Sequence, residues 1–441
     1  MSTAPERLAE SLEVLEQRRG RLDPIRKAWA GESPAAFLSA ESRDALDKRL
    51  RRLGVNFPRL AVRSLVDRLT VSGFRAEDDD DADDATWRLY ERAGLVAGSE
   101  LVHTDRALYG AAYVMVWGHA RDPRRPVVVL DNPRTAHVET DPATGEVVRA
   151  VRRWTAGGKS HALMVEPDAF RRYSAHRDAP GNAPGSWTAG EAWPNPWGSV
   201  PVVPFVRRQT TDDHDTGTPF VADILDLTDA VAKVLQDAMV TSEYYARPRR
   251  WATGLEIVED EDGNPVDPFG DGRFLQSEAP ETRFGQLDAA RLDGYSDLLA
   301  SLTQQIGTLT GLPPHYLGLH GDQPPNADSI RASETQLSSL AYSEHRQLSP
   351  AWSDVAGWLH AVAEGLNEPP TGLRTLWASP ETRTPGQAAD AAAKLAGIGV
   401  PLRALLADPL GYESDEISGI MAEVSRTRFE AAATDLRGLM P

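Results

Sequence analysis

Residues 219–246 read PFVADILDLTDAVAKVLQDAMVTSEYYA and carry the clearest helical pattern of the chain. At about 100° per residue, one arc of this segment collects the apolar side chains Phe220, Ile224, Leu227, Val231, Val234, Leu235 and Ala238. The opposite arc collects the charged side chains Asp223, Asp226, Asp229, Lys233 and Asp237. The pattern predicts an amphipathic helix roughly 40 Å long, which Pro248 ends.

A second amphipathic helix is predicted over residues 289–310. Its apolar arc holds Leu292, Tyr295, Leu298, Leu299, Leu302, Ile306 and Leu309. Its polar arc holds Asp293, Asp297, Ser301, Gln304 and Thr308. The roughly 40 residues between the two helices contain short strand-like runs and turns, so antiparallel helices would carry a small β insert at the tip of a stalk.

The flanking regions differ in their periodicity. Residues 1–75 and 85–109 have helical patterns, whereas short apolar runs separated by turn residues predict an antiparallel meander over 111–205. Within that region, the Pro-, Gly- and Trp-rich stretch 178–197 predicts a long loop. A third long helix is expected over 327–363, running through Pro350, followed by small Ala-rich helices. The fold class is therefore α+β.

Composition excludes several classes of function. The chain has 441 residues and a formal net charge of 47 − 65 = −18. It would therefore repel a polyanion over most of its surface, although it could surround DNA without binding the phosphates tightly. It has no cysteine, which excludes disulfides and thiolate sites. Its longest apolar run, residues 107–118, is too short to span a membrane.

No motif for catalysis, phosphate binding or a metal is present. The chain lacks the P-loop, HExxH and GxSxG patterns, and its ten histidines follow no metal-ligand spacing. No cofactor and no metal are therefore expected. The acidic run 78–84 allows a cation site, but a solvated loop before a helix is the favoured interpretation. A pair of carboxylates brought together by folding stays open as an enzymatic alternative.

Four segments resemble the portal proteins of tailed bacteriophages, of the siphophage type found in phages of actinobacteria. They are 141–152 (DPATGEVVRAVR), similar to the wing hairpin; 195–205 (NPWGSVPVVPF), similar to the strand before the stem; 242–254 (SEYYARPRRWATG), similar to the stem-to-clip junction; and 311–318 with 326–334 (GLPPHYLG, NADSIRASE), similar to the segment leading into the long helix. The resemblance covers about residues 56–432.

The resemblance implies the portal fold, with a mixed wing domain, long antiparallel stem helices, a small β-rich clip and an α-helical crown. The implied boundaries are 1–218 for the N-terminal helices and β-rich wing, 219–246 and 289–310 for the stem helices, 247–288 for the clip, 311–365 for the tunnel loop and the long kinked wing helix, and 366–441 for the crown.

By the same resemblance, the chain is a structural subunit and not an enzyme. It would form a homo-oligomeric ring, usually of twelve subunits, at one vertex of the capsid in the virion, after assembly in the host cytoplasm. Double-stranded DNA would pass through the channel of this head-to-tail connector during packaging and ejection. Its other implied partners are the large terminase, the head-completion adaptor, and the major capsid and scaffolding proteins, with no membrane.

Three groups of site residues are predicted. The stem arc Asp223, Asp226, Asp229, Lys233 and Asp237 faces either the channel lumen, where a surface without phosphate-binding cations would let DNA slide, or the outside of the stem. The tunnel loop nearest the DNA is His320, Gly321, Asp322, Gln323, Pro324, Pro325 and Asn326, unless it is a plain helix connector. Partner docking at the clip is assigned to Arg247, Arg249, Arg250, Trp251, Glu256 and Glu259.

The arginines at the stem-to-clip junction allow two interpretations. They either contact phosphate or form ion pairs with the acidic clip residues, and the second is favoured because those carboxylates are abundant and close in sequence. At the level of the whole chain, the alternatives to a portal are a hydrolase with a dispersed carboxylate site, or another adaptor or scaffold subunit of a phage head. A stalk of two long helices argues against the small adaptors.

Overall fold

A computed structural model describes residues 3–32, 55–76, 83–176, 186–213, 216–246, 250–254, 281–286, 293–319, 327–381, 385–412 and 414–438. The chain divides into two compact units. The larger unit combines residues 56–225 and 307–441 with the N-terminal 32 residues, and the smaller contains residues 226–306. Helices and strands are mixed along the chain, as the α+β class predicts.

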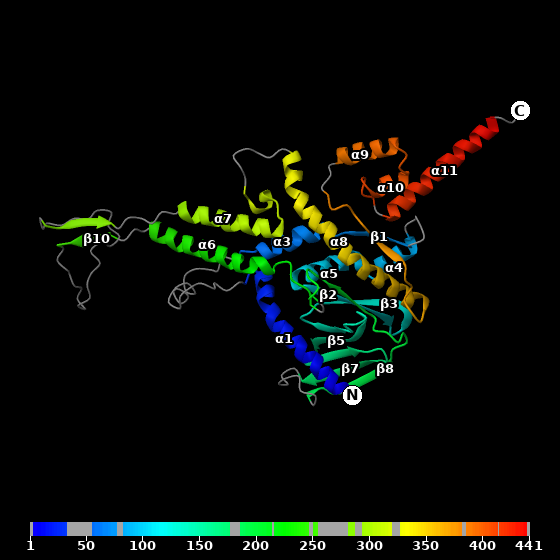
Figure 1. Cartoon of the computed structure of the whole chain (residues 1–441), viewed down its shortest axis with the longest axis horizontal. Helices are drawn as coiled ribbons and strands as arrows, with labels where there is room; N and C mark the ends of the chain where they lie inside the picture. Colours follow the sequence, from blue (N-terminus) through cyan, green and yellow to red (C-terminus); the bar gives the residue numbers. More distant parts are fainter. Residues whose placement is uncertain are drawn as a thin grey trace. The chain divides into compact units, whose positions relative to one another are not determined.

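Two antiparallel sheets form the centre of the larger unit (Figure 1). The first has the strand order β3-β2-β9 and is built from β2 (Ala111–His119), β3 (Asp122–Asp131) and β9 (Val202–Val206). The second is the predicted meander, in the order β4-β5-β6-β7-β8. Its strands are β4 (Ala136–Thr140), β5 (Val147–Ala156), β6 (Lys159–Val165), β7 (Ala169–His176) and β8 (Thr188–Pro194).

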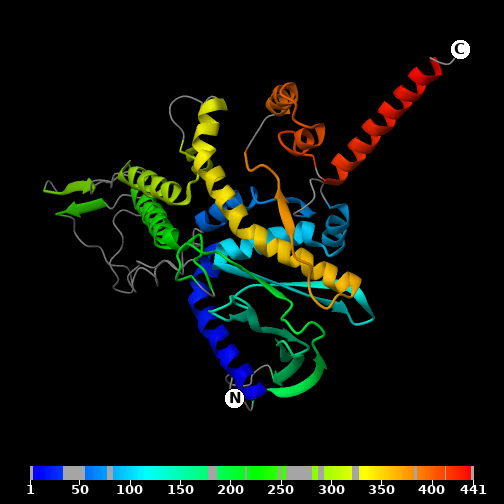
Figure 2. The same cartoon turned by 45° about the vertical axis from the view of Figure 1, so that its right-hand side comes forward.

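Strand alternation gives each sheet two buried faces. On β6, Leu163 and Val165 point towards the first sheet and share a core with Tyr113 and Met115. Ala162 and Met164 point the other way, where they pack with Leu8, Leu12 and Leu15 of α1 (Ala4–Ala30). In two views α1 lies against the five-stranded sheet (Figures 1 and 2). The meander is therefore held between the first sheet and α1.

Helices cover the remaining face of the first sheet. Phe205 on β9 packs edge-on against the fully buried Trp352 of α8 (Ala327–Glu364), with ring centroids 4.8 Å apart. Gly98 of α5 (Leu95–Tyr109) lies close enough to Leu130 on β3 that a Cβ there would be 3.2 Å from it. The long helix expected to run through Pro350 is thus confirmed as α8.

The remaining elements complete the two units. In the larger unit these are α3 (Phe57–Val66), β1 (Val71–Ala76), α4 (Asp84–Arg92), the 3₁₀ turns η2 (Ala222–Ile224) and η3 (Pro314–Leu317), β12 (Leu373–Trp377), α9 (Pro385–Gly397), α10 (Leu402–Ala407) and α11 (Ser414–Gly438). The smaller unit holds α6 (Leu225–Ala246), which begins at the boundary, then β10 (Arg250–Thr253), β11 (Arg283–Gln286) and most of α7 (Asp293–Thr310).

Four local predictions were wrong. Residues 188–194 were expected in a loop and form β8, because backbone pairing with β7 tolerates the glycine and the prolines that suggested a loop. Residues 71–75 were expected to be helical and lie in β1 (Val71–Ala76). The partner of β1 is β12, which lies in the region expected to be entirely helical. The helix expected over 85–109 is interrupted at Gly94, whose φ of 73° ends one helix and begins the next.

A buried ion triad joins three elements of the larger unit. Glu344 of α8 accepts a hydrogen bond from Arg207 Nε at 2.9 Å and forms a second ion pair with Arg106 of α5. All three side chains are at most 6% exposed. Arg106 also donates to Gln347 Oε1 at 2.8 Å. The triad therefore connects α5, α8 and the segment that follows β9.

Burial and pairing act in opposite directions on these charges. Burial raises the pKa of Glu344, but Arg106 and Arg207 together outweigh it and hold the pKa below its usual value. Burial lowers the pKa of Arg106, yet a guanidinium starts so far above neutral pH that the pair stays charged. Each charge in this triad is tolerated in the interior only because the others are present.

Replacement of the central carboxylate tests this dependence. Glu344→Gln leaves two buried guanidinium groups without their counter-ion and should cost about 3–5 kcal/mol of unfolding free energy. Glu364→Gln, on the same helix, removes a carboxylate that is exposed and paired with His360, and should cost less than about 1 kcal/mol. Urea unfolding followed by tryptophan fluorescence measures both values. Equal losses would show that the triad is not a critical support.

Candidate functional site

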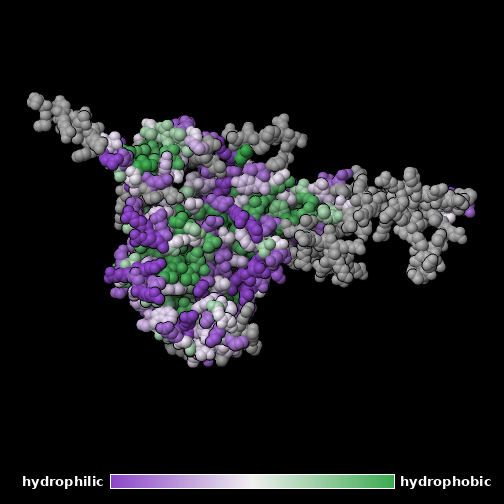
Figure 3. All heavy atoms as spheres, turned by 180° about the vertical axis from the view of Figure 1, so that it is seen from behind, coloured by the Kyte–Doolittle hydropathy of each residue, from purple (hydrophilic) through white to green (hydrophobic). Residues whose placement is uncertain are grey.

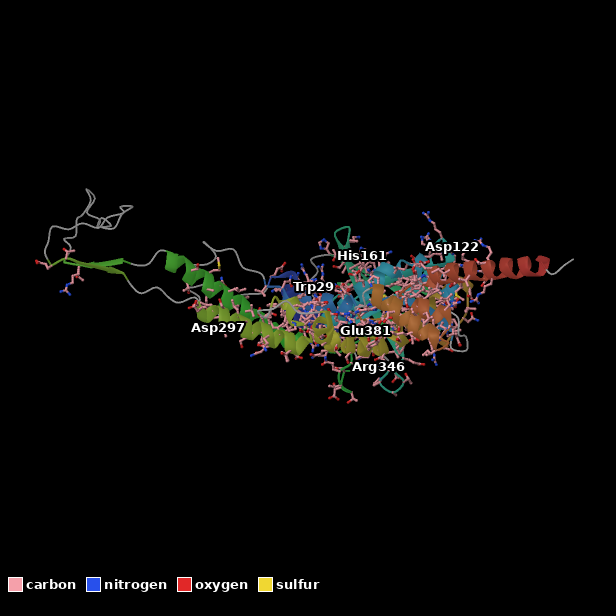
Figure 4. The ribbon with its side chains drawn as sticks, turned by 90° about the horizontal axis from the view of Figure 1, so that it is seen from above. Trp29, Asp122, His161, Asp297, Arg346 and Glu381 are labelled. Atoms are coloured by element: carbon pink, nitrogen blue, oxygen red, sulfur yellow. The ribbon has the colours of Figure 1, made fainter. Side chains whose placement is uncertain are left out.

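The two predicted amphipathic helices are α6 and α7, and they lie side by side (Figures 1 and 4). Thr241, near the end of α6, and Tyr295, near the start of α7, share a hydrogen bond of 3.1 Å between their hydroxyl groups. Because the end of one helix meets the start of the other, the pair is antiparallel. Helix α6 begins at Leu225, and the six residues before it form an irregular segment and the 3₁₀ turn η2, not the helix expected from Pro219 onwards.

The apolar arcs were predicted well on α6 and less completely on α7. All seven residues of the first arc are buried or half-buried, with Ile224, Val231 and Val234 the most buried on or just before α6. On α7, Ile306 is fully buried, whereas Leu298 is 47% exposed and Leu309 is 54% exposed. Leu292 lies outside the described residues.

The polar arc of α6 divides into two parts. Asp223 and Asp226 are exposed, and Asp229 is half-buried. Lys233 and Asp237, one helical turn apart, are half-buried and form an ion pair with each other, so they add no net charge. The exposed carboxylates of the predicted arc are therefore Asp223, just before α6, and Asp226, in its first turn.

Helix α7 presents a second acidic face. The residues of its predicted polar arc are all exposed, and Asp297 is labelled in Figure 4. Leu298 and Leu309 are 11 residues apart, which places them about 20° from each other around the helix axis. An exposed leucine seam thus runs beside the acidic face, which is the arrangement of a helix with one wet face and one face for a further apolar partner.

The chain enters α6 through a segment that is anchored to the larger unit. The backbone N–H of Arg207 donates to Gly110 O at 2.7 Å, and the N–H of Phe220 donates to Ala107 O at 2.8 Å. The guanidinium of Arg207 donates to Thr218 O and lies 5.2 Å from the centre of the Phe220 ring. The same arginine therefore belongs to the buried triad and holds the residues that lead to α6.

Two glycines make this anchorage possible. Gly110 has a φ of 84° and Gly217 has a φ of 57°, both in the left-handed region. A Cβ on Gly110 would lie 2.6 Å from Thr216 O, and a Cβ on Gly217 would lie 2.4 Å from Gly110 O. The two backbones are thus in direct contact, with no room for a side chain between them.

The other predicted site residues are only partly described. The tunnel loop, His320 to Asn326, lies outside the described residues, as do Arg247, Arg249, Glu256 and Glu259. Arg250 and Trp251 lie on β10, which pairs with β11 in a two-stranded sheet. Of the acidic run, Asp83 caps α4 by accepting hydrogen bonds from the backbone of Ala85 and Thr86, which favours the structural interpretation.

No pattern in the sequence pointed to Arg106, Arg207, Glu344 or the two glycines. They are spread from residue 106 to residue 344, and no local pattern links them. Over the described residues, no three His, Asp or Glu side chains gather in a way that could hold a metal ion. No helix among the residues searched is both long and apolar enough to cross a membrane.

Comparisons with known proteins agree with the resemblance noted in the sequence. The family described as "Phage portal protein, SPP1 Gp6-like" matches residues 10–423. The portal protein of Mycobacterium phage D29 is 30% identical over 365 residues, covering 78% of this chain and 73% of the relative. The portal protein of Mycobacterium phage L5 is 30% identical over 362 residues, with the same coverage.

Two solved structures are similar to this chain at lower sequence identity. A chain from the neck of an empty GTA particle, computed with C6 symmetry, has a TM-score of 0.48 and 15% identity, covering 82% of this chain and 90% of that chain. A chain from the neck of a native GTA particle, computed with C12 symmetry, has a TM-score of 0.47 and 14% identity, covering 84% and 94%.

A pair of glycine substitutions tests the contact at the base of α6. Gly145 has a φ of 77° and no atom within 4 Å of an added Cβ, so Gly145→Ala should cost only the left-handed strain of about 1–2 kcal/mol. Gly110→Ala adds a backbone clash and should cost roughly 3 kcal/mol or more. Thermal and urea unfolding compare the two variants. A similar cost at both positions would contradict a direct backbone contact.

Proposed function

Because the chain belongs to the SPP1 Gp6-like family of phage portal proteins, we propose that it forms a ring whose channel conducts double-stranded DNA. Portal proteins are structural components of the virion and not enzymes, and a role in DNA packaging at the head-to-tail connection follows from the family. The channel, the number of subunits and the assignment of individual residues are the proposal. The ring is expected to contain twelve subunits.

The antiparallel pair α6 and α7 carries the proposal. It has the architecture of a stem: two helices connected through a segment that contains the small sheet β10–β11, which corresponds to the clip. The exposed seam of Leu298 and Leu309 needs an apolar neighbour, and the equivalent helices of adjacent subunits would provide one. The acidic faces of α6 and α7 would then remain exposed to water.

We assign the acidic start of α6 to the lumen of the channel. Asp223 and Asp226 are exposed, and neither has a lysine or arginine partner over the described part of the chain. A lumen that lacks free cations offers few ionic contacts to phosphate, so DNA meets small barriers as it slides. Screening over about 8–10 Å limits the repulsion to the closest approach.

The remaining parts of the portal plan are proposed by the same reasoning. The two sheets with α1, α5 and α8 correspond to the wing, and α9 to α11 correspond to the crown. The loop 320–326 would lie nearest the DNA, and the segment 247–288 would dock terminase and then the head-completion adaptor. The major capsid and scaffolding proteins would surround the ring at the capsid vertex, after assembly in the host cytoplasm.

Electron microscopy of the purified protein tests the ring. Class averages should show particles with a central channel and about twelve-fold rotational symmetry. Monomers would require the measurement to be repeated on particles co-assembled with capsid and scaffolding proteins, where the ring should appear at one vertex. Closed particles of low order without a channel would end the proposal of a DNA-conducting ring.

Charge reversal tests the lumen assignment separately. Asp223→Lys and Asp226→Lys place phosphate-binding cations on the channel wall and should lower the amount of DNA packaged per head several-fold, most strongly at low salt. Glu91→Lys, on the exposed face of α4, makes the same change of charge elsewhere and should package normally. Normal packaging by both aspartate variants would place this face on the outside of the stem.

A further inference from the structure

A large open groove in the larger unit has no place in the proposed function. It lies between the β2–β3 hairpin, strands β5 to β8 of the meander, and the end of α8, and it has a volume of about 870 Å³. This is within the range of cavities that bind ligands. Its walls are aromatic, with Trp117, Trp154, Phe170, Trp193 and Trp197. We call it the aromatic groove.

The aromatic groove is open to solvent and is not a packing defect in the hydrophobic core. Trp193 is 39% exposed and stacks on Phe170, with the ring planes 4° apart and the centroids at 5.5 Å. The indole is thus held flat against a buried ring while its other face meets solvent. Figure 3 shows apolar residues reaching the surface in patches framed by hydrophilic side chains. A fixed, half-exposed aromatic platform is typical of sites that bind a large apolar group.

The charge of the groove is opposite to that of the chain. Its lining residues include three arginines, Arg124, Arg152 and Arg172, and one carboxylate, Glu191, so their formal charge is 3 − 1 = +2. The whole chain has a formal charge of −18. Arg152 is paired with Asp131, whereas Arg124 and Arg172 form no ion pair with any residue in the described ranges. The guanidinium of Arg172 lies 5.8 Å from the centre of the Trp154 ring. Two guanidinium groups without a carboxylate partner among the described residues therefore border the apolar surface and are placed to receive carboxylates.

An exposed strand edge borders the same groove. Strand β8 is the last in the order β4-β5-β6-β7-β8, and over the described residues it pairs only with β7. All of its side chains are exposed, and Glu191, Trp193 and Pro194 line the groove. An edge strand leaves a row of backbone N–H and C=O groups unpaired, which a second extended chain can use.

We propose that the aromatic groove binds an extended, acidic peptide segment of a partner protein. The segment would lie along β8, insert one large apolar side chain among the tryptophans, and place its carboxylates on Arg124 and Arg172. Backbone pairing supplies affinity in this mode of recognition, and the pocket and the charges supply specificity. All of these residues belong to one unit of one subunit, so the site does not require a ring or a channel.

A peptide explains the groove better than single-stranded nucleic acid does. Tryptophan and arginine can also stack on bases, but a strand edge recognises a peptide backbone and not a sugar-phosphate chain. Binding of a polyanion also requires several phosphate contacts, whereas the groove offers two arginines without a carboxylate partner in the described ranges, beside Glu191 on a strongly acidic chain.

Selection from a random peptide library displayed on the surface of a phage or yeast tests the proposal with the full chain as the target. Sequences retained by the wild type and lost on the Trp193→Ala, Arg172→Glu double variant should share one Trp, Phe or Leu flanked by Asp or Glu. A fluorescein-labelled peptide of that consensus should bind in an anisotropy assay. Each single substitution should weaken its binding by roughly tenfold or more.

Controls separate this result from loss of folding and from other occupants. Arg172 is exposed and Trp193 loses only its stacking on Phe170, so both variants should still unfold cooperatively, with a midpoint lowered by at most a few degrees. Arg428→Glu on α11 should bind the peptide normally. The proposal is overturned if no enrichment depends on the groove, or if the consensus is basic. It is also overturned if an oligothymidylate binds with the same dependence on Trp193 and Arg172. A change of the oligomeric state in Arg172→Glu would overturn it as well, because the groove would then be occupied by a second copy of this chain.

Discussion

The buried carboxylate of Glu344 is the constraint on which the arrangement of the larger unit depends. A charge in the interior requires a counter-charge within hydrogen-bond distance, and Glu344 has two, one on α5 and one directly after β9. Shifting either helix along its axis would break an ion pair that has no replacement from water. Because Arg207 also donates to Thr218 O, the triad links the residues before α6 to α8 within the larger unit.

Features set by local periodicity could be predicted from the sequence, and features set by distant pairing could not. The apolar arc that ends in Val231 and Val234 follows from spacing within one helix, as does the continuation of α8 through Pro350. Strands β1 and β12 are short and about 300 residues apart in the chain, so neither shows its partner in its own sequence. The glycine and prolines in and around β8 predicted a loop, although pairing with β7 makes it a strand.

The same distinction applies to the candidate site. The acidic arc of α6 was visible as a pattern, but the ion pair of Lys233 with Asp237 concentrates its net charge towards Asp223 and Asp226. The aromatic groove could not be predicted from the sequence, because its walls come from six strands of two sheets and from the end of α8, between Trp117 and Asn367. The tryptophans are separated along the chain and look like ordinary core residues until the fold brings them together.

The contact between Gly110 and Gly217 has a consequence for how this lineage can change over time. Most packed positions drift in pairs, since a larger residue on one side can be accommodated by a smaller one on the other. Here both positions are glycines, so no smaller residue exists that could compensate a larger side chain at the other position. Both glycines should therefore be retained together, without the paired substitutions seen at other packed positions. A homologue that has lost one of them must have a different backbone conformation before the following helix.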